Sequence, residues 1–195
     1  MQDDDIHRKR VRHYENPADV RELTFSCFQR RPLLCDDSRR EMLARSIDRA
    51  GEGHGFRLTA FVFMPEHVHL VVYPVPRADP VDQYLYAIKR PLSFRIKTML
   101  QSSDVPLLKE LTVSQRPGRT VFRFWQEGPG HDRNLPNQVA VLNAIDYAHR
   151  NPLKRGLCAA ANDWKWSSAR FYATDGAVVD ADLPKLHRLP SHFLT

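Results

Sequence analysis

Two histidines separated by one residue, His67 and His69, have the spacing of a metal-binding pair. Side chains two positions apart in a β-strand project from the same face of the sheet. Two imidazoles on one face can bind a single divalent metal, while Leu70 and Val72 would point to the opposite face and pack as core. A short pattern of this kind is also found in cores and on surfaces, so a structural role for both histidines stays open.

A tyrosine and an asparagine form a second candidate pair. Tyr147 and Asn151 are four residues apart in a helical pattern, hence on one helical face. A phenol can attack a phosphodiester and form a covalent intermediate, as other side-chain nucleophiles do. A metal bound by the two histidines could polarise that phosphate, and the amide of Asn151 could complete the coordination. Alternatively, Tyr147 is a half-buried aromatic and Asn151, which precedes Pro152, is a helix cap.

The elements that must position these side chains follow from the spacing of the apolar residues. Alternation and aromatic content predict strands at 22–28, 56–64, 68–73 and 120–125, and helical spacing predicts helices at 36–52, 81–101 and 135–150. Pro91 is expected to kink or interrupt the second helix. This order is that of a ferredoxin-like split βαβ unit. We therefore predict an α+β sandwich, an antiparallel sheet with helices on one face, plus an added C-terminal helix that carries Tyr147.

The length of the chain favours one domain with two tails. Its 195 residues suffice for one well-buried core and are few for two domains. We assign residues 1–14 to a basic N-terminal arm, 15–174 to a single domain and 175–195 to an irregular tail. The cations of the arm are Arg8, Lys9, Arg10 and Arg12. Such a run is either a contact to phosphates or a solvated lead-in.

Composition and charge narrow the partner and the compartment. The net charge of +6 favours a polyanionic partner, with nucleic acid as the first candidate. Arg123, Trp125 and Arg133 combine cations with an aromatic ring, which suits a single strand. The three cysteines lack CxxC spacing, which indicates reduced thiols and no zinc ribbon. Without a long apolar run or a secretory start, we expect a cytoplasmic protein with no membrane partner.

Three blocks of the sequence carry a family resemblance. They are residues 65–69 (PEHVH), 146–157 (DYAHRNPLKRGL) and 163–169 (DWKWSSA). Together they resemble the single-tyrosine HUH transposases, and in particular the REP-associated tyrosine transposases, from about Thr24 to Tyr172. The third block is a marker of the family to which we assign no catalytic role.

The resemblance implies cleavage and rejoining of single-stranded DNA at hairpin or palindromic repeats. The resemblance also implies that His67 and His69 bind Mg²⁺ or Mn²⁺. It implies that Tyr147 attacks the phosphodiester, which leaves a 5′-phosphotyrosine and a free 3′ hydroxyl. Asn151 is at the position of the third metal ligand, where relatives often have glutamine. DNA is the implied partner, which places the protein on the nucleoid. Relatives act as monomers or as homodimers that exchange the tyrosine helix, and the sequence leaves this open.

Two other functions stay open at this point. One is a domesticated protein that binds hairpin DNA and no longer cleaves it. The other is a metal-dependent hydrolase of a small substrate, which would use a water nucleophile and need no tyrosine. The presence of His67, His69 and Tyr147 together argues against the first alternative without excluding it.

Overall fold

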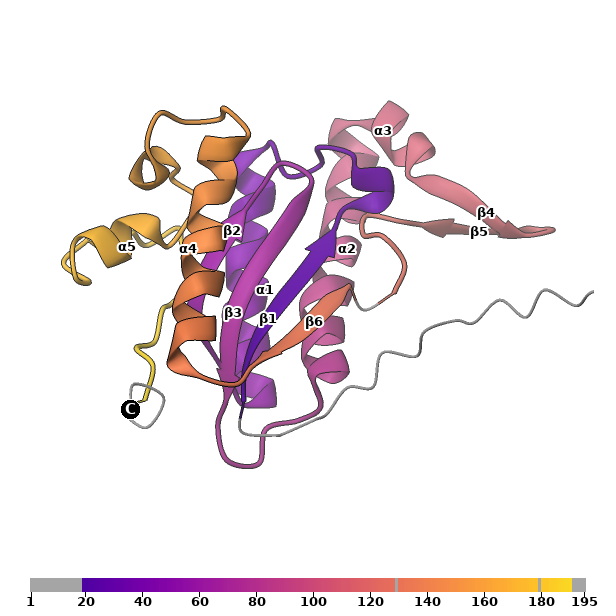
Figure 1. Ribbon diagram of the computed structural model, residues 1–195. Helices are drawn as coiled ribbons and strands as arrows, with labels where there is room; N and C mark the ends of the chain where they lie inside the picture. Colours follow the sequence, from indigo (N-terminus) through magenta and orange to yellow (C-terminus); the bar gives the residue numbers. More distant parts are fainter. Residues whose placement is uncertain (1–18, 129, 179, 191–195) are drawn as a thin grey trace, which may run out of the picture.

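A four-stranded antiparallel sheet forms the centre of the molecule (Figure 1). The computed structural model describes residues 19–128, 130–178 and 180–190. The strands of the sheet are β1 (Val20–Ser26), β2 (Phe56–Phe63), β3 (His67–Pro74) and β6 (His131–Leu135), in the order β2-β3-β1-β6. With α1 (Asp37–His54) after β1 and α2 (Val81–Ser103) after β3, this is the predicted ferredoxin-like arrangement.

Helices cover both faces of this sheet. Helices α1 and α2 lie behind it in Figure 1, and α4 (Gln138–Lys154) lies in front. Alternate side chains of strand β3 contact the helices on opposite faces. Leu70 and Val72 pack in the cluster that includes the buried residues of α1 and α2. Val71 instead packs with Ala144 and Ile145 of α4. The odd-numbered residues of β3, which include both histidines, therefore face α4.

The prediction of a last strand at 120–125 is wrong for the main sheet. Strand β5 (Arg119–Phe122) pairs with β4 (Thr112–Arg116) in a separate hairpin, which follows α3 (Val105–Glu110) and projects from the body (Figure 1). The fourth strand of the sheet is β6, which pairs with β1. In β6 only Leu135 is buried, because the strand lies at the sheet edge. No apolar alternation marks such a strand in the sequence.

Two predicted helices differ from the observed ones in ways that matter for the site. Helix α2 is continuous from Val81 to Ser103 with Pro91 inside it, so the proline does not interrupt it. Helix α4 begins at the cap residue Asn137, whose side chain accepts from the Ala140 amide, and extends to Lys154. The tyrosine helix is thus one turn longer at its C-terminal end than the sequence predicts.

The segment after α4 covers the outer edge of β2. It contains the 3₁₀ helix η2 (Ala161–Asp163) and α5 (Ala169–Ala173), and it forms a bridge between Val62 and Ser167. The amide of Phe63 donates to the Trp166 carbonyl at 2.8 Å. A second 3₁₀ helix, η1 (Phe28–Arg30), follows β1.

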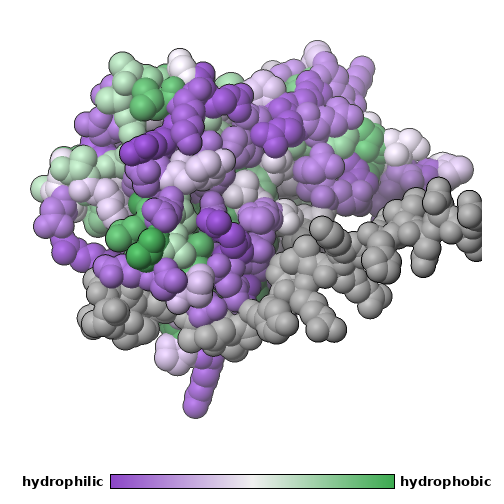
Figure 2. All heavy atoms as spheres, viewed as in Figure 1, coloured by the Kyte–Doolittle hydropathy of each residue, from purple (hydrophilic) through white to green (hydrophobic). Residues whose placement is uncertain are grey.

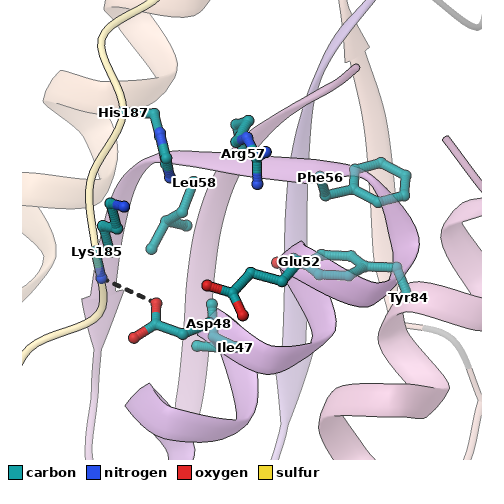
Figure 3. A pocket seen from close by; sticks show the side chains of 10 residues that line it. Ile47, Asp48, Glu52, Phe56, Arg57, Leu58, Tyr84, Lys185 and His187 are labelled. Atoms are coloured by element: carbon teal, nitrogen blue, oxygen red, sulfur yellow. Dashed lines mark hydrogen bonds between the residues drawn. The ribbon is translucent and has the colours of Figure 1, made fainter. Parts of the chain in front are cut away.

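The C-terminal tail has no helix or strand among its described residues, and it is anchored to the domain. The His187 amide donates to the Leu58 carbonyl at 2.8 Å, and the Lys185 amide donates to the Asp48 carboxylate at 2.9 Å. Figure 3 shows this contact, with the tail running past α1 and β2. Below the tail lies a small pocket that Glu52, Arg57 and Tyr84 help to line.

The surface is predominantly hydrophilic on the side that carries α4 (Figure 2). Apolar patches on this side lie over α4 and the loop that follows it. The exposed apolar side chains of these segments are Val139, Leu142, Leu153 and Leu157. In the described part of the chain, no helix has the length and apolar character needed to cross a membrane.

Candidate active site

The two histidines lie side by side on the face of β3 that α4 covers. Their Nε2 atoms are 2.9 Å apart, and each residue is only 6% exposed. The buried apolar neighbours Val68 and Leu70 point to the opposite face. Both imidazoles therefore direct a ring nitrogen at the same small volume, which is what binding one cation requires.

Each imidazole has a partner for its other nitrogen. His67 Nδ1 is 3.1 Å from Glu66 Oε1, and His69 Nδ1 is 3.0 Å from the hydroxyl of Thr24. Because a carboxylate only accepts hydrogen bonds, His67 carries its proton on Nδ1 and keeps a lone pair on Nε2. Thr24 is directly opposite His69 in the β1–β3 ladder. Metal-ligating histidines are generally held by partners of this kind.

Burial keeps both imidazoles neutral. Burial, together with the smaller effects of the neighbouring His67 and Arg30, lowers the pKa of His69 to about 3. Burial also lowers the pKa of His67, although the Glu66 carboxylate acts in the opposite direction. Neutral imidazoles have the free lone pairs that metal binding needs. The donor set, two neutral imidazoles with fixed outer partners, fits a divalent cation.

The phenol of Tyr147 lies beside this pair. Its ring centroid is 6.0 Å from that of His69, with the ring planes at 82°. The Tyr147 side chain is half exposed, and the ammonium of Lys154 lies 4.8 Å from its ring centroid. The structure therefore brings together two segments that are almost eighty residues apart in the sequence. The chemical roles of the three side chains remain predictions.

Asn151 lies inside α4, one turn after Tyr147. Its Nδ2 donates to the Tyr147 carbonyl at 2.9 Å, so it does not cap a new helix. A ligand role would use the other end of the amide, Oδ1, and stays a prediction. Within the described residues, no group of three or more His, Cys, Asp or Glu side chains is placed to bind a metal. The imidazole pair would thus need a ligand of another type.

Glu66, Arg155 and Arg30 are site residues that the sequence did not reveal. Glu66 is buried, and its Oε1 accepts from Arg155 at 2.7 Å and lies 3.8 Å from Arg30. Burial raises the pKa of Glu66, but the Arg155 hydrogen bond and His67 outweigh it, so the pKa lies below its usual value. Glu66 and Arg155 both belong to the sequence blocks of the family resemblance, but nothing in the sequence shows that they pair.

Comparison with known proteins supports the resemblance. No protein-family model matches the chain. It is 27% identical over 117 residues to a curated Haemophilus influenzae protein named "Putative REP-associated tyrosine transposase". That match covers 60% of this chain and 61% of the relative. A solved structure of a REP-associated tyrosine transposase bound to a REP hairpin matches with a TM-score of 0.66 at 17% identity, covering 91% of this chain and 98% of that one.

The chain resembles the REP-associated tyrosine transposases in sequence and shares their fold. The α+β architecture predicted from the sequence is thereby confirmed. The chain spans about three fifths of the length of the curated relative that it matches.

The third block of the resemblance to the REP-associated tyrosine transposases has a structural role. Trp166 is buried and donates from Nε1 to Asp37 at 2.7 Å, and Trp164 donates to the Phe63 carbonyl at 3.1 Å. The guanidinium of Arg40 lies over both indole rings, at 5.3 and 5.7 Å from their centroids. The block therefore fixes the chain that covers β2 and does not line the site.

The residues predicted to contact DNA separate into three groups. Arg8, Lys9, Arg10 and Arg12 lie outside the described residues. The prediction for Trp125 is wrong: it is 7% exposed and packs edge-on against Phe25 and Phe124, so its ring faces the core and not the solvent.

The two predicted arginines are on or near the surface and pair with carboxylates. Arg133 is half exposed on β6 and contacts Glu22 at 2.6 Å. Arg123 is mostly covered and contacts Glu127 at 3.1 Å. Their contact with DNA stays a prediction.

Proposed function

We propose that this protein is a metal-dependent endonuclease and strand transferase that acts on single-stranded DNA bearing hairpin or palindromic repeats. The observation that carries the proposal is the convergence of Tyr147 with the His67–His69 pair. The similarity to a protein named as a REP-associated tyrosine transposase supports the type of reaction. The matched structure that is bound to a REP hairpin supports the type of DNA.

His67 and His69 would hold a Mg²⁺ or Mn²⁺ ion, with Asn151 as the third protein ligand. The amide oxygen suits these hard or borderline cations, and neutral imidazole is a common ligand of divalent metals. When bound, the ion supplies a positive charge that polarises the scissile phosphate. Glu66 and Thr24 hold the rings in orientation, because each contacts the Nδ1 atom that does not face the ion site.

Tyr147 is the nucleophile of the proposed reaction. The phenol gives up its proton as its oxygen attacks the phosphorus. A P–O bond to Tyr147 forms, and the bond between phosphorus and O3′ breaks. The bonding pair leaves with O3′, which takes up a proton and becomes a 3′ hydroxyl. The 5′ phosphate stays on Tyr147, so a second 3′ hydroxyl can attack it and rejoin DNA without ATP.

The charge around the site fits a phosphodiester substrate. Lys154 lies against the Tyr147 ring, and Arg155 and Arg30 surround the Glu66 carboxylate. Arg30 and Arg155 have side chains more than half exposed, so their charges reach solvent beside the buried histidines. Cations in such positions favour the binding of DNA phosphates.

A covalent adduct tests the proposal. The protein is incubated with Mn²⁺ and labelled hairpin DNA from the repeats of its own genome, and the products are separated on a denaturing gel. We expect a protein–DNA band that disappears in Tyr147→Phe while DNA binding persists. Tyr172→Phe, which changes a tyrosine on α5, should keep the band.

Three other results would contradict the proposal. Hairpin binding with no adduct from any repeat would show a binding protein that no longer cleaves. An adduct that persists in Tyr147→Phe would exclude this tyrosine as the nucleophile. Metal-dependent hydrolysis of a small phosphodiester at an unchanged rate in Tyr147→Phe would indicate a hydrolase that uses water.

A further inference from the structure

The solvent face of α2 carries a row of aromatic and cationic side chains. Tyr86, Arg90, Phe94 and Lys97 are three or four residues apart, so they lie along one side of the helix, and all four are exposed. We call this row the α2 stripe. Tyr86 is 58% exposed and Phe94 is 71% exposed. Phe94 is the most exposed large hydrophobic side chain in the described part of the chain.

The stripe has internal order. The Arg90 guanidinium lies 5.4 Å from the Tyr86 ring centroid and donates to the Tyr86 hydroxyl at 2.5 Å. Tyr86 and Phe94 are two helical turns apart, which is about 12 Å along the axis. Two flat apolar surfaces thus flank one guanidinium on a rigid helix, and no described segment covers either ring.

The charge of this region indicates what would bind there. Residues 81–119, from α2 through the β4–β5 hairpin, contain seven Lys or Arg and three Asp or Glu. They supply a net +4 of the +6 of the chain. Aromatic rings together with cations are the combination that binds single-stranded nucleic acid, because bases stack on the rings and phosphates pair with the charges.

A groove of about 910 Å³ adjoins the stripe. Tyr86, Lys89 and Arg90 help to line it, together with Gly128 from the loop that leads into β6. Lys89 lies over the Phe25 ring of β1 and donates to the Gly128 carbonyl at 3.1 Å, which places the groove beside the β6 edge of the sheet. The histidines and Tyr147 are on the opposite face, so a strand would pass around this edge to reach the stripe.

We propose that the α2 stripe and its groove form a second binding surface for single-stranded DNA, distinct from the site of cleavage. Bases stack on Tyr86 and Phe94, while Arg90 and Lys97 contact the phosphates. The inference rests on the proposed function in one respect, namely that the nucleic acid is DNA. The stripe then holds the single-stranded flank of a hairpin whose scissile phosphate lies at Tyr147.

Binding without metal tests the stripe apart from cleavage. The probe is a fluorescein-labelled oligothymidylate of about 20 nucleotides, titrated in EDTA and followed by anisotropy. Tyr86→Ala and Phe94→Ala should each weaken binding by about 5- to 150-fold. Tyr86→Phe, which keeps the ring, should bind like the wild type. Phe94→Leu, which is apolar but has no ring, should be as weak as Phe94→Ala.

A matched control and two further measurements complete the test. Val139→Ala removes a similarly exposed apolar group from α4 and should change nothing. Replacing Arg90 and Lys97 by alanine should lower the slope of log K against log salt by roughly 0.7 for each phosphate that the protein no longer neutralises. An oligonucleotide that contains 5-iodouracil should crosslink to the peptide that contains Tyr86 or Phe94. Urea unfolding checks that each variant is folded.

Wild-type affinity in both alanine variants would overturn the inference. So would unchanged DNA binding accompanied by a change in oligomeric state in sedimentation, which would assign the stripe to contact between protein copies. The two proposals fail separately. Loss of oligothymidylate binding in the stripe variants, with no adduct from wild-type protein, would reject only the cleavage reaction. An adduct from wild-type protein, with unchanged oligothymidylate binding in the stripe variants, would reject only the stripe.

Discussion

Glu66 and Thr24 determine the orientation of the imidazole pair although neither is a proposed ligand. Each contacts the Nδ1 atom of one histidine, so the two Nε2 atoms face each other. The partner of His67 is a buried carboxylate, and a charged acceptor orients an imidazole more strongly than a neutral one does. At this scale, the affinity of the site for metal depends on residues outside the HxH pattern.

Replacing Glu66 by glutamine tests this dependence. We expect Glu66→Gln to weaken Mn²⁺ binding about 10- to 100-fold, because loss of an outer partner typically has that effect. Titration calorimetry or the EPR signal of free Mn²⁺ measures it. Glu110→Gln, which changes an exposed glutamate paired with Arg31, should bind Mn²⁺ like the wild type. Equal affinity in Glu66→Gln and wild type would show that the carboxylate does not support the site.

An ion pair connects the C-terminal end of α4 to the turn that precedes the histidine strand β3. Arg155, its C-cap residue, donates to Glu66 in the turn between β2 and β3. One carboxylate therefore contacts both the end of the tyrosine helix and a histidine of the pair. This ion pair therefore adds to the packing of α4 on the sheet in fixing the separation of Tyr147 and His69.

Removal of the Arg155–Glu66 ion pair should loosen the C-terminal end of α4 and with it the position of Tyr147 beside the histidines. In Arg155→Ala we expect slower adduct formation and faster hydrogen exchange in the last turn of α4, with partial recovery in Arg155→Lys. The matched control is Arg150→Ala, which breaks an exposed pair with Asp146 on the same helix and should leave both rates unchanged. Wild-type adduct formation in Arg155→Ala would contradict the coupling.

Ser168 connects the covering segment to β2. Its hydroxyl accepts from the Phe61 amide at 2.9 Å and lies 2.7 Å from His149 Nε2 of α4. Ser168 is 1% exposed, so these partners have no access to bulk water. This hydroxyl therefore joins three elements in the core.

Ser168→Ala should be destabilising. The change leaves a buried amide without an acceptor, which costs about 1–3 kcal/mol. Urea unfolding measures this cost as a lower midpoint with an unchanged slope. Ser102→Ala, which removes an exposed hydroxyl near the end of α2, should change the unfolding free energy by less than about 0.5 kcal/mol. A destabilisation no larger than that of Ser102→Ala would show that Phe61 finds another acceptor.

Across the whole molecule, buried weak acids set the response to alkaline pH. Burial raises the pKa of Cys27 from 9.0 to about 12 and that of Tyr172 to about 12, and it also raises the pKa of Tyr84. The folded state then keeps protons that the unfolded state loses, so stability is full below pH 9 and falls as pH rises. As pH rises, Cys27 is the first of the three to lower the stability, because a free thiol loses its proton at a lower pH than a free phenol does.

This pH dependence can be measured between pH 8 and pH 10. We expect the free energy of unfolding to fall over this interval by about 1.4 kcal/mol through Cys27, since one retained proton changes it by about that amount per pH unit above the free pKa of 9.0. In Cys27→Val most of this fall should vanish. Cys35→Val, at an exposed position, should behave like the wild type. An equal fall in Cys27→Val would assign the effect to other groups.

The sequence determined those features that depend on local periodicity. Alternation in β3 placed the histidines opposite Leu70 and Val72, and helical spacing placed Tyr147 and Asn151 one turn apart. Such patterns survive in any fold, because they follow from the geometry of a single strand or helix. Most elements and the ferredoxin-like order could therefore be predicted.

Only the tertiary structure decided which segments meet. Strand β6 has too few apolar residues to be recognised, and it belongs to the sheet because β1 supplies its backbone partners. The sequence predicts that Trp125 contacts DNA, but its ring lies in the core, because Phe25 and Phe124 pack around it. The pairing of Arg155 with Glu66, and the approach of Tyr147 to His69, join residues far apart in the chain. Contacts of that kind depend on the packing of α4 against the sheet, which no local pattern encodes.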